Sequence, residues 1–141
     1  MSESTIVAIA AAVRAAETSA ASVTAGALER ISERNPALNA FIAVDEELAL
    51  QAAAAIDAAI ERGDIVGPLA GVPLAVKDTE DTIGYITTYG SRLWAQGPVA
   101  TRDSVLVARL KAAGCVVIGK TNTPELAAKG ETDNLVFGAT G

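Results

Sequence analysis

Gly67-Pro-Leu-Ala-Gly71-Val-Pro-Leu-Ala-Val-Lys77-Asp78 is the stretch that decides the fold of this 141-residue chain. Its apolar run, residues 72–76, is short, bounded by glycine and proline, and typical of a buried strand. A second apolar run, residues 115–118, follows a helical segment that begins at Asp103, the predicted N-cap, and ends at Gly114. The order strand, irregular segment, helix, strand predicts an α/β layer with at least two parallel strands.

The segments on either side of this layer have helical patterns. Apolar residues recur at helical spacing over 23–31, and Asn35-Pro36 is predicted to end that helix. A second helix is expected over about 45–62, with Gly63 just past its end. Thr123 followed by Pro124 predicts an N-cap and the start of a short helix that runs through residue 128.

The composition restricts the chemistry that this chain can perform alone. It has 17 acidic and 11 basic residues, a formal charge of −6, which argues against electrostatic binding to nucleic acid or an anionic membrane. Cys115 is the only cysteine, and there is no histidine, so a disulfide framework, a Ser-His-Asp triad and a histidine zinc site are excluded. A base that acts near neutral pH must then be a carboxylate with a raised pKa or a lysine with a lowered one.

The apolar N-terminal run, residues 6–13, does not have the pattern of a secretory signal. No Lys or Arg precedes it, and Glu3 stands where positive charge would be expected. A run of eight residues is also too short to span a membrane. We therefore expect a cytoplasmic protein.

Lys77 is the first candidate for chemistry, because it follows directly on the first predicted strand. Ligands and catalytic groups collect at strand ends in α/β sheets. A lysine partly withdrawn from water there could take a proton from a serine hydroxyl. The plainer interpretation is a lysine that reaches solvent or pairs with Asp78. Spacing alone leaves both open.

Two other patterns are better explained as structure than as sites. Residues 114–121 fit the phosphate-binding pattern G-x-x-x-x-G-K-[ST], but the middle residues are apolar and mostly β-branched. Pro124 would also interrupt the helix that this motif requires, so we predict a strand followed by a turn. Asp78, Glu80 and Asp81 lack the pattern of a calcium loop and are expected to form a solvated acidic turn.

The segment 67–78 resembles the lysine-bearing segment of the amidase signature family. The similarity continues, in order and at the family's spacing, through Thr87-Thr88-Tyr-Gly90-Ser91 and through residues 102–110 and 113–122. The N-terminal helical region fits as well, with residues 27–31 followed by residues 35–41. This collinearity over nearly the whole chain is much more specific than any single motif.

The resemblance implies an α/β fold with a mixed central sheet, of which this chain carries the N-terminal helices and the first strands and helices. It also implies hydrolysis of a carboxylic amide by a Ser–cis-Ser–Lys triad through an acyl-enzyme. Lys77 matches the triad lysine, and Asp78, Thr88, Ser91 and Asn122 lie in matched motifs and are expected to support the site. Neither a cofactor nor a metal is implied.

The family's Gly/Ser-rich loop, which holds both serines and the oxyanion-hole amides, has no counterpart in this sequence. We therefore expect a chain truncated before that loop and inactive alone. We expect an N-terminal helical segment, residues 1–66, and the first part of the amidase core, residues 67–141, within one incomplete domain.

Three functions remain open. The first is the N-terminal part of an amidase acting on a small-molecule amide. The second is a non-catalytic binding or assembly module, which would self-associate or pair with a C-terminal half. The third is part of the A subunit of a tRNA-dependent amidotransferase, ranked below the general amidase because Asn122-Thr-Pro-Glu-Leu126 is less like that protein's version of the segment.

Overall fold

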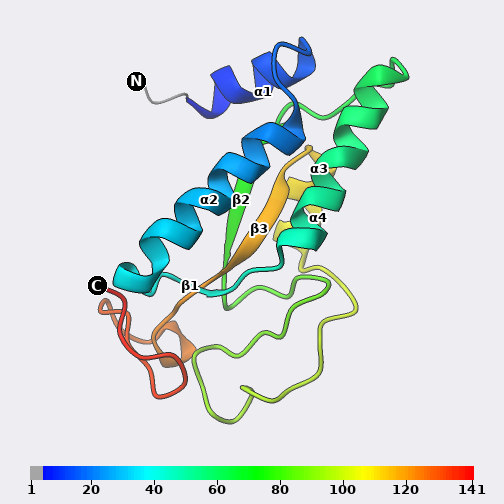
Figure 1. Cartoon of the computed structure of the whole chain (residues 1–141). Helices are drawn as coiled ribbons and strands as arrows, with labels where there is room; N and C mark the ends of the chain where they lie inside the picture. The colour runs from blue at the N-terminus through cyan, green and yellow to red at the C-terminus, as the bar shows by residue number, and fades with distance from the viewer. Residues whose placement is uncertain (1–4) are drawn as a thin grey trace.

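The computed structural model describes residues 5–141 (Figure 1). Residues 1–4, including the Glu3 that precedes the apolar run, lie outside the described part. The elements are α1 (Ile6–Arg14), α2 (Ala20–Leu38), β1 (Phe41–Ala43), α3 (Glu46–Glu61), β2 (Pro73–Lys77), α4 (Val105–Ala112), β3 (Val116–Thr121) and the 3₁₀ turn η1 (Glu125–Ala127).

A mixed three-stranded sheet, in the order β1-β3-β2, forms the centre of the molecule. β2 and β3 are parallel and are joined through α4, which confirms the predicted parallel pair. β1 pairs antiparallel with β3 at the other edge and is not predicted by the sequence pattern. β3 continues to Thr121, so Lys120 lies inside the strand and the turn predicted at this position is wrong.

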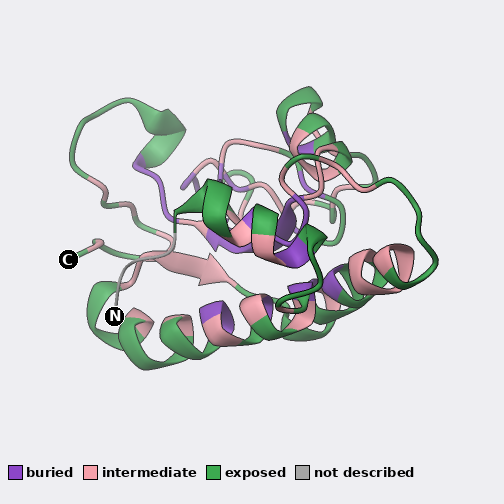
Figure 2. Ribbon diagram, turned by 90° about the horizontal axis from the view of Figure 1, so that it is seen from above, coloured by how far each residue is buried: buried purple, intermediate pink, exposed green. Residues whose placement is uncertain are grey.

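Helices cover both faces of the sheet. α2 and α3 lie side by side across one face, and α4 lies on the other (Figure 1). Strand alternation divides the side chains of β3 accordingly, because Val116 and Ile118 join the α2–α3 core while Val117 packs with Val107 of α4. The buried positions of the helices turn toward the sheet (Figure 2).

Small side chains make this close packing possible. The core under α2 and α3 is rich in alanine: Ala20, Ala27, Ala49, Ala53 and Ala70 are all buried in it. Because these residues come from both sides of position 66, the helical segment and the strands share one core. The boundary between residues 66 and 67 stays a prediction.

Three helix ends differ from the sequence prediction. α2 runs through Pro36 to Leu38 and ends where Asn39 adopts a left-handed conformation with φ of 50°. The N-cap of α4 is Ser104 rather than Asp103, whose carboxylate instead accepts from the backbone N–H of Ile83 at 2.8 Å. The segment after Pro124 forms a 3₁₀ turn with no side-chain cap rather than the expected helix.

α3 agrees with its prediction. The Asp45 side chain caps it through the backbone N–H of Leu48, and Gly63, with φ of 76°, follows its last turn. No helix within residues 5–141 combines the length and the apolar character needed to cross a bilayer.

Candidate active site

The carboxyl ends of β2 and β3 bring the predicted site residues to one edge of the sheet. Lys77 pairs in register with Thr121, and the backbone N–H of Asp78 donates to the Thr121 carbonyl at 3.0 Å. Asn122 follows at once on β3 and donates its backbone N–H to Ala40, next to β1, at 2.8 Å. The parallel pairing therefore places Lys77, Asp78 and Asn122 close together in the fold.

Lys77 is exposed at this edge. Burial alternates along the strand end, with Val76 and Asp78 buried and Lys77 exposed between them, as expected where successive side chains point to opposite faces. Within residues 5–141 its ammonium group has no hydrogen-bond or ion-pair partner. We expected Lys77 to be partly withdrawn from water. Residues 5–141 do not bury it.

Asp78 pairs with a different lysine. Its carboxylate lies 3.1 Å from the Nζ of Lys120, and both side chains are completely buried. The same carboxylate accepts from the backbone N–H of Thr88, at 3.2 and 3.3 Å, and from the Thr88 hydroxyl. The suggested Lys77–Asp78 pair is therefore wrong, because Asp78 points inward while Lys77 points to solvent.

The ammonium group of Lys120 uses all its donors. Besides Asp78, it donates to the backbone carbonyl of Glu80 at 2.8 Å and to the Thr87 hydroxyl at 3.1 Å. Three N–H bonds thus meet three acceptors. Lys120 joins β3 to the turn after β2 and to the loop that follows.

Thr88 and Ser91 belong to that loop and are both buried. The Thr88 hydroxyl accepts from the backbone N–H of Gly90 at 3.1 Å, and the Thr88 carbonyl accepts from the Ser91 N–H at 2.9 Å. The Ser91 hydroxyl accepts from the Leu93 N–H at 3.3 Å. Thr88 therefore contacts the Asp78–Lys120 pair directly, whereas the bonds of Ser91 are to its own turn.

Asn122 organises a second polar cluster. Its side-chain amide donates to the Gly138 carbonyl at 3.2 Å and to the Thr140 hydroxyl at 3.1 Å, and its carbonyl oxygen accepts from Asn134 at 2.7 Å. The Thr140 hydroxyl in turn donates to the Asn39 carbonyl at 2.9 Å. Asn122 thus fastens the last described residues to the end of β3.

Lys120 is the residue that sequence reasoning missed. Residues 114–121 mimic a phosphate-binding motif, and excluding that motif leaves Lys120 without a role in the sequence prediction. The sequence nevertheless contains a signal for this role. Lys120 lies two residues after the buried β-branched run that ends at Ile118, and a lysine inside such a buried strand must find acceptors within the protein.

Tyr85 and Cys115 have raised pKa values. Burial raises the pKa of the Tyr85 phenol; the nearby Asp45 backbone lowers it somewhat, and the Asp45 carboxylate raises it further. Burial likewise raises the pKa of the Cys115 thiol, which lies in a core cluster with Ala10 and Val72. Within residues 5–141 no group of three or more His, Cys, Asp or Glu side chains could hold a metal ion.

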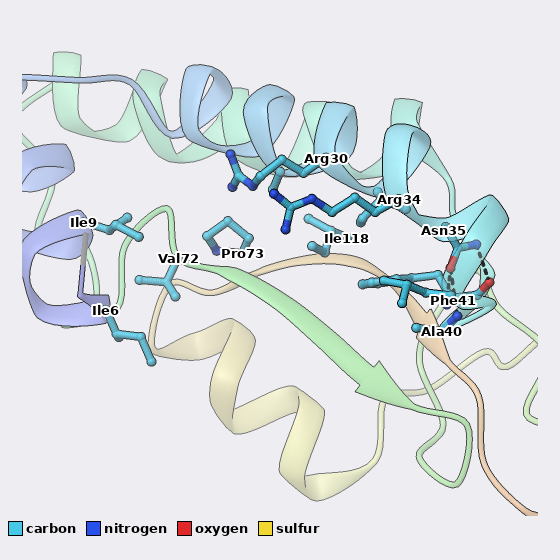
Figure 3. Close-up of a pocket in the computed structure, with 13 residues that line it drawn as sticks. Ile6, Ile9, Arg30, Arg34, Asn35, Ala40, Phe41, Val72, Pro73 and Ile118 are labelled. Carbon is cyan, nitrogen blue, oxygen red and sulfur yellow. Dashed lines mark hydrogen bonds between the residues drawn. The ribbon is translucent and has the colours of Figure 1, made fainter. Parts of the chain in front are cut away.

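An apolar groove of about 390 Å³ lies along α2, apart from these residues (Figure 3). Ile6 and Ile9 of α1, Val72 and Pro73 at the start of β2, and Phe41 contribute to its lining. Arg30 and Arg34, one turn apart on α2, project over it. None of the predicted site residues lines this groove.

Comparison with known proteins decides the family. The Amidase family model matches residues 22–141. The chain belongs to the amidase family. It is 45% identical to the A subunit of the glutamyl-tRNA(Gln) amidotransferase of Acidothermus cellulolyticus, over 96% of its own length and 27% of that protein.

Two solved structures show the same fold. A bacterial aryl acylamidase of the amidase signature family is 30% identical and superposes with a TM-score of 0.90, over 96% of this chain and 28% of that one. The peptide amidase of Stenotrophomonas maltophilia is 33% identical with a TM-score of 0.85, over 99% and 30%. The chain thus spans about a quarter of the length of the curated relatives it matches and under a third of these structures.

Proposed function

We propose that this chain supplies the lysine-bearing part of an amidase-family enzyme that breaks the C–N bond of a carboxylic amide. The observation that carries this proposal is the position of Lys77. It stands at the carboxyl end of β2, exposed, with its neighbouring carboxylate turned inward and bound to Lys120. A lysine accepts a proton only when its amine is uncharged. A nearby carboxylate would instead stabilise the charged ammonium form.

The proposed chemistry follows the family's serine mechanism. Lys77 accepts the proton of a serine hydroxyl through a second serine, and the serine oxygen attacks the amide carbonyl. The C–N bond breaks as the proton passes to the leaving nitrogen, and water then releases the acid from the acyl-enzyme. Both serines and the oxyanion-hole donors would have to come from chain beyond residues 1–141.

Among the enzymes of this family, the curated relatives favour the A subunit of an amidotransferase over a general amidase. Relatives that are 44–51% identical are named as A subunits of glutamyl-tRNA(Gln) amidotransferases. The aryl acylamidase and peptide amidase match at 30–33%. Similarity over most of the chain outweighs the short segment Asn122–Leu126, which by itself favours a general amidase.

An amidotransferase chain of this kind would act together with other chains. By the relatives' name, the amide group is transferred to glutamyl-tRNA(Gln). A net charge of −6 gives residues 1–141 no electrostatic attraction for tRNA. We therefore assign tRNA binding to parts of the enzyme outside residues 1–141, and the amide-cleaving step to the chain that carries Lys77.

The test is substitution of Lys77 in the natural polypeptide that contains these residues. Lys77→Ala should lower kcat for ammonia release from an amide by about 10²–10⁴-fold, the usual contribution of a general base. Lys111→Ala, which removes a lysine of α4 from its partly buried pair with Asp103, is the matched control and should leave turnover unchanged. Wild-type turnover in the Lys77→Ala variant would refute the proposal.

A second assay separates the two enzyme classes. An amidotransferase should transfer the nitrogen of a cleaved amide to glutamyl-tRNA(Gln) when its partner chains are present. A general amidase should hydrolyse simple amides without them and transfer nothing to tRNA.

A further inference from the structure

Lys120 is the one lysine among residues 5–141 whose side chain is completely buried, and the proposed chemistry does not use it. It cannot reach a substrate, because no part of it is exposed. It is also a poor base where it stands, since its three N–H bonds are held by Asp78, Glu80 and Thr87.

Stability alone does not explain why a charged pair occupies this place. Taking two charges out of water carries a large desolvation cost, and apolar residues of similar volume often stabilise a fold as well or better. The Asp78–Lys120 pair therefore needs a reason beyond its own attraction.

The consequence of the pair for Lys77 gives that reason. Asp78 is the residue next to Lys77, and a carboxylate so close would attract an ammonium group if it were not bound elsewhere. Lys120 and Thr88 together contact both oxygens of that buried carboxylate.

The pair also fixes the backbone that carries Lys77. Lys120 lies opposite Val76 in the β2–β3 register, and its ammonium group holds the Glu80 carbonyl three residues after Lys77. The Glu80 backbone N–H donates in turn to the Lys77 carbonyl at 3.1 Å. Lys77 is thus held between a paired strand and a turn anchored by Lys120.

We propose that Lys120 is a positioning residue for Lys77: it keeps the Asp78 carboxylate from pairing with the Lys77 ammonium group and fixes the strand end on which Lys77 stands. This inference rests on the proposed function. The other charged groups on the turn after β2 and on the α2 face beside β2 are unchanged in the test below: Glu80, Asp81, Arg30 and Arg34.

The experiment removes the charge of Lys120 and follows the pH dependence of amide hydrolysis in the natural polypeptide. Lys120→Gln keeps donors for Glu80 and Thr87 but leaves the Asp78 carboxylate without its cation. The acidic limb of the kcat/KM profile should move to higher pH by about one unit or more, because the released carboxylate now holds the proton on Lys77. Lys111→Gln, the same exchange in the partly buried pair with Asp103, should not move it.

The double variant Asp78→Asn/Lys120→Gln separates positioning from simple structural support. It removes both charges, so the acidic limb should return to its wild-type pH even if kcat stays reduced. Should Lys120→Gln fail to fold, Asp78→Asn alone is compared with this double variant. Asp78→Asn leaves the positive charge of Lys120 unbalanced near Lys77, so its acidic limb should move to lower pH, whereas the double variant should keep the wild-type limb.

The outcomes are distinguishable from failure of the proposed function. Loss of activity in Lys77→Ala together with an unshifted profile in folded Lys120→Gln would refute the positioning role alone. A shifted profile in the double variant, or an acidic limb at or above the wild-type pH in Asp78→Asn, would also refute it. Full activity in Lys77→Ala would remove the function on which the inference rests.

Discussion

The side chain of Tyr85 is buried without a hydrogen bond to its hydroxyl from the described residues. Its ring packs with Val76, Val107 and Val117, but its hydroxyl has no hydrogen-bond partner within residues 5–141. The Asp45 backbone lies near enough to influence the phenol without forming a well-made hydrogen bond to it. A buried hydroxyl without a partner costs about 1–3 kcal/mol.

Tyr85→Phe should therefore leave the free energy of unfolding unchanged or raise it by up to about 1 kcal/mol at neutral pH. The difference from the wild type should grow above pH 10. Burial raises the folded pKa of Tyr85 above its ordinary 10.0, so the unfolded chain loses this proton first and wild-type stability falls as pH rises. Urea unfolding at neutral and alkaline pH measures both effects.

Tyr89→Phe is the control, since Tyr89 is only half-buried and packs edge-on against Trp94. A loss of more than about 1 kcal/mol in Tyr85→Phe at neutral pH would mean that the hydroxyl has a partner after all.

At the scale of elements, α2 and α3 are joined by more than apolar packing. The Asp57 carboxylate of α3 accepts from the backbone N–H groups of Ala20 and Ala21, at 2.7 and 3.0 Å. These are among the first N–H groups of α2, which have no partner inside the helix. The Ser19 side chain caps the same end through Ser22.

Asp57→Ala should destabilise the fold by about 1–2 kcal/mol, because it leaves helix N–H groups unpaired and removes a negative charge from a helix N-terminus. Thermal or urea unfolding measures the loss. Asp64→Ala, which breaks an exposed pair with Arg62 near the end of α3, should cost little. Equal losses in the two variants would show that Asp57 acts only as a surface charge.

The same elements show which parts of the fold the sequence could predict. β2, α4 and β3 were predictable because each has an apolar run or helical period bounded by glycine or proline. β1 was not, because three half-buried residues become a strand only by pairing with β3. α2 passes Pro36 because the exposed last turn leaves the carbonyl that lost its donor open to water.

The candidate site was predictable in position but not in its pairing. Strand order and family resemblance place Lys77, Asp78 and Asn122 at one edge. Which of two lysines takes the Asp78 carboxylate depends on the side to which each points, and this follows from a strand register that contains a bulge between Leu74 and Ala75.

For the whole molecule, one edge of the sheet, along β2, has no strand paired to it among the described residues. β2 pairs only with β3 within residues 5–141, and the apolar groove along α2 opens beside it (Figure 3). An unpaired strand edge next to exposed apolar side chains promotes association. The curated relatives, of which this chain spans 23–27%, contain much more chain that could cover such a surface.

The isolated 141-residue chain should therefore self-associate as its concentration rises, which sedimentation velocity would measure against its mass of 14.3 kDa. Ile6→Lys places a charge in the groove at a residue that is 58% exposed, so the fold should tolerate it while the monomer fraction rises. Val7→Lys, on the next residue of α1 and outside the groove lining, should leave association unchanged. A monodisperse monomer at every concentration would show that the open edge is harmless, because the acidic surface or the twist of β2 would then suffice to keep copies apart.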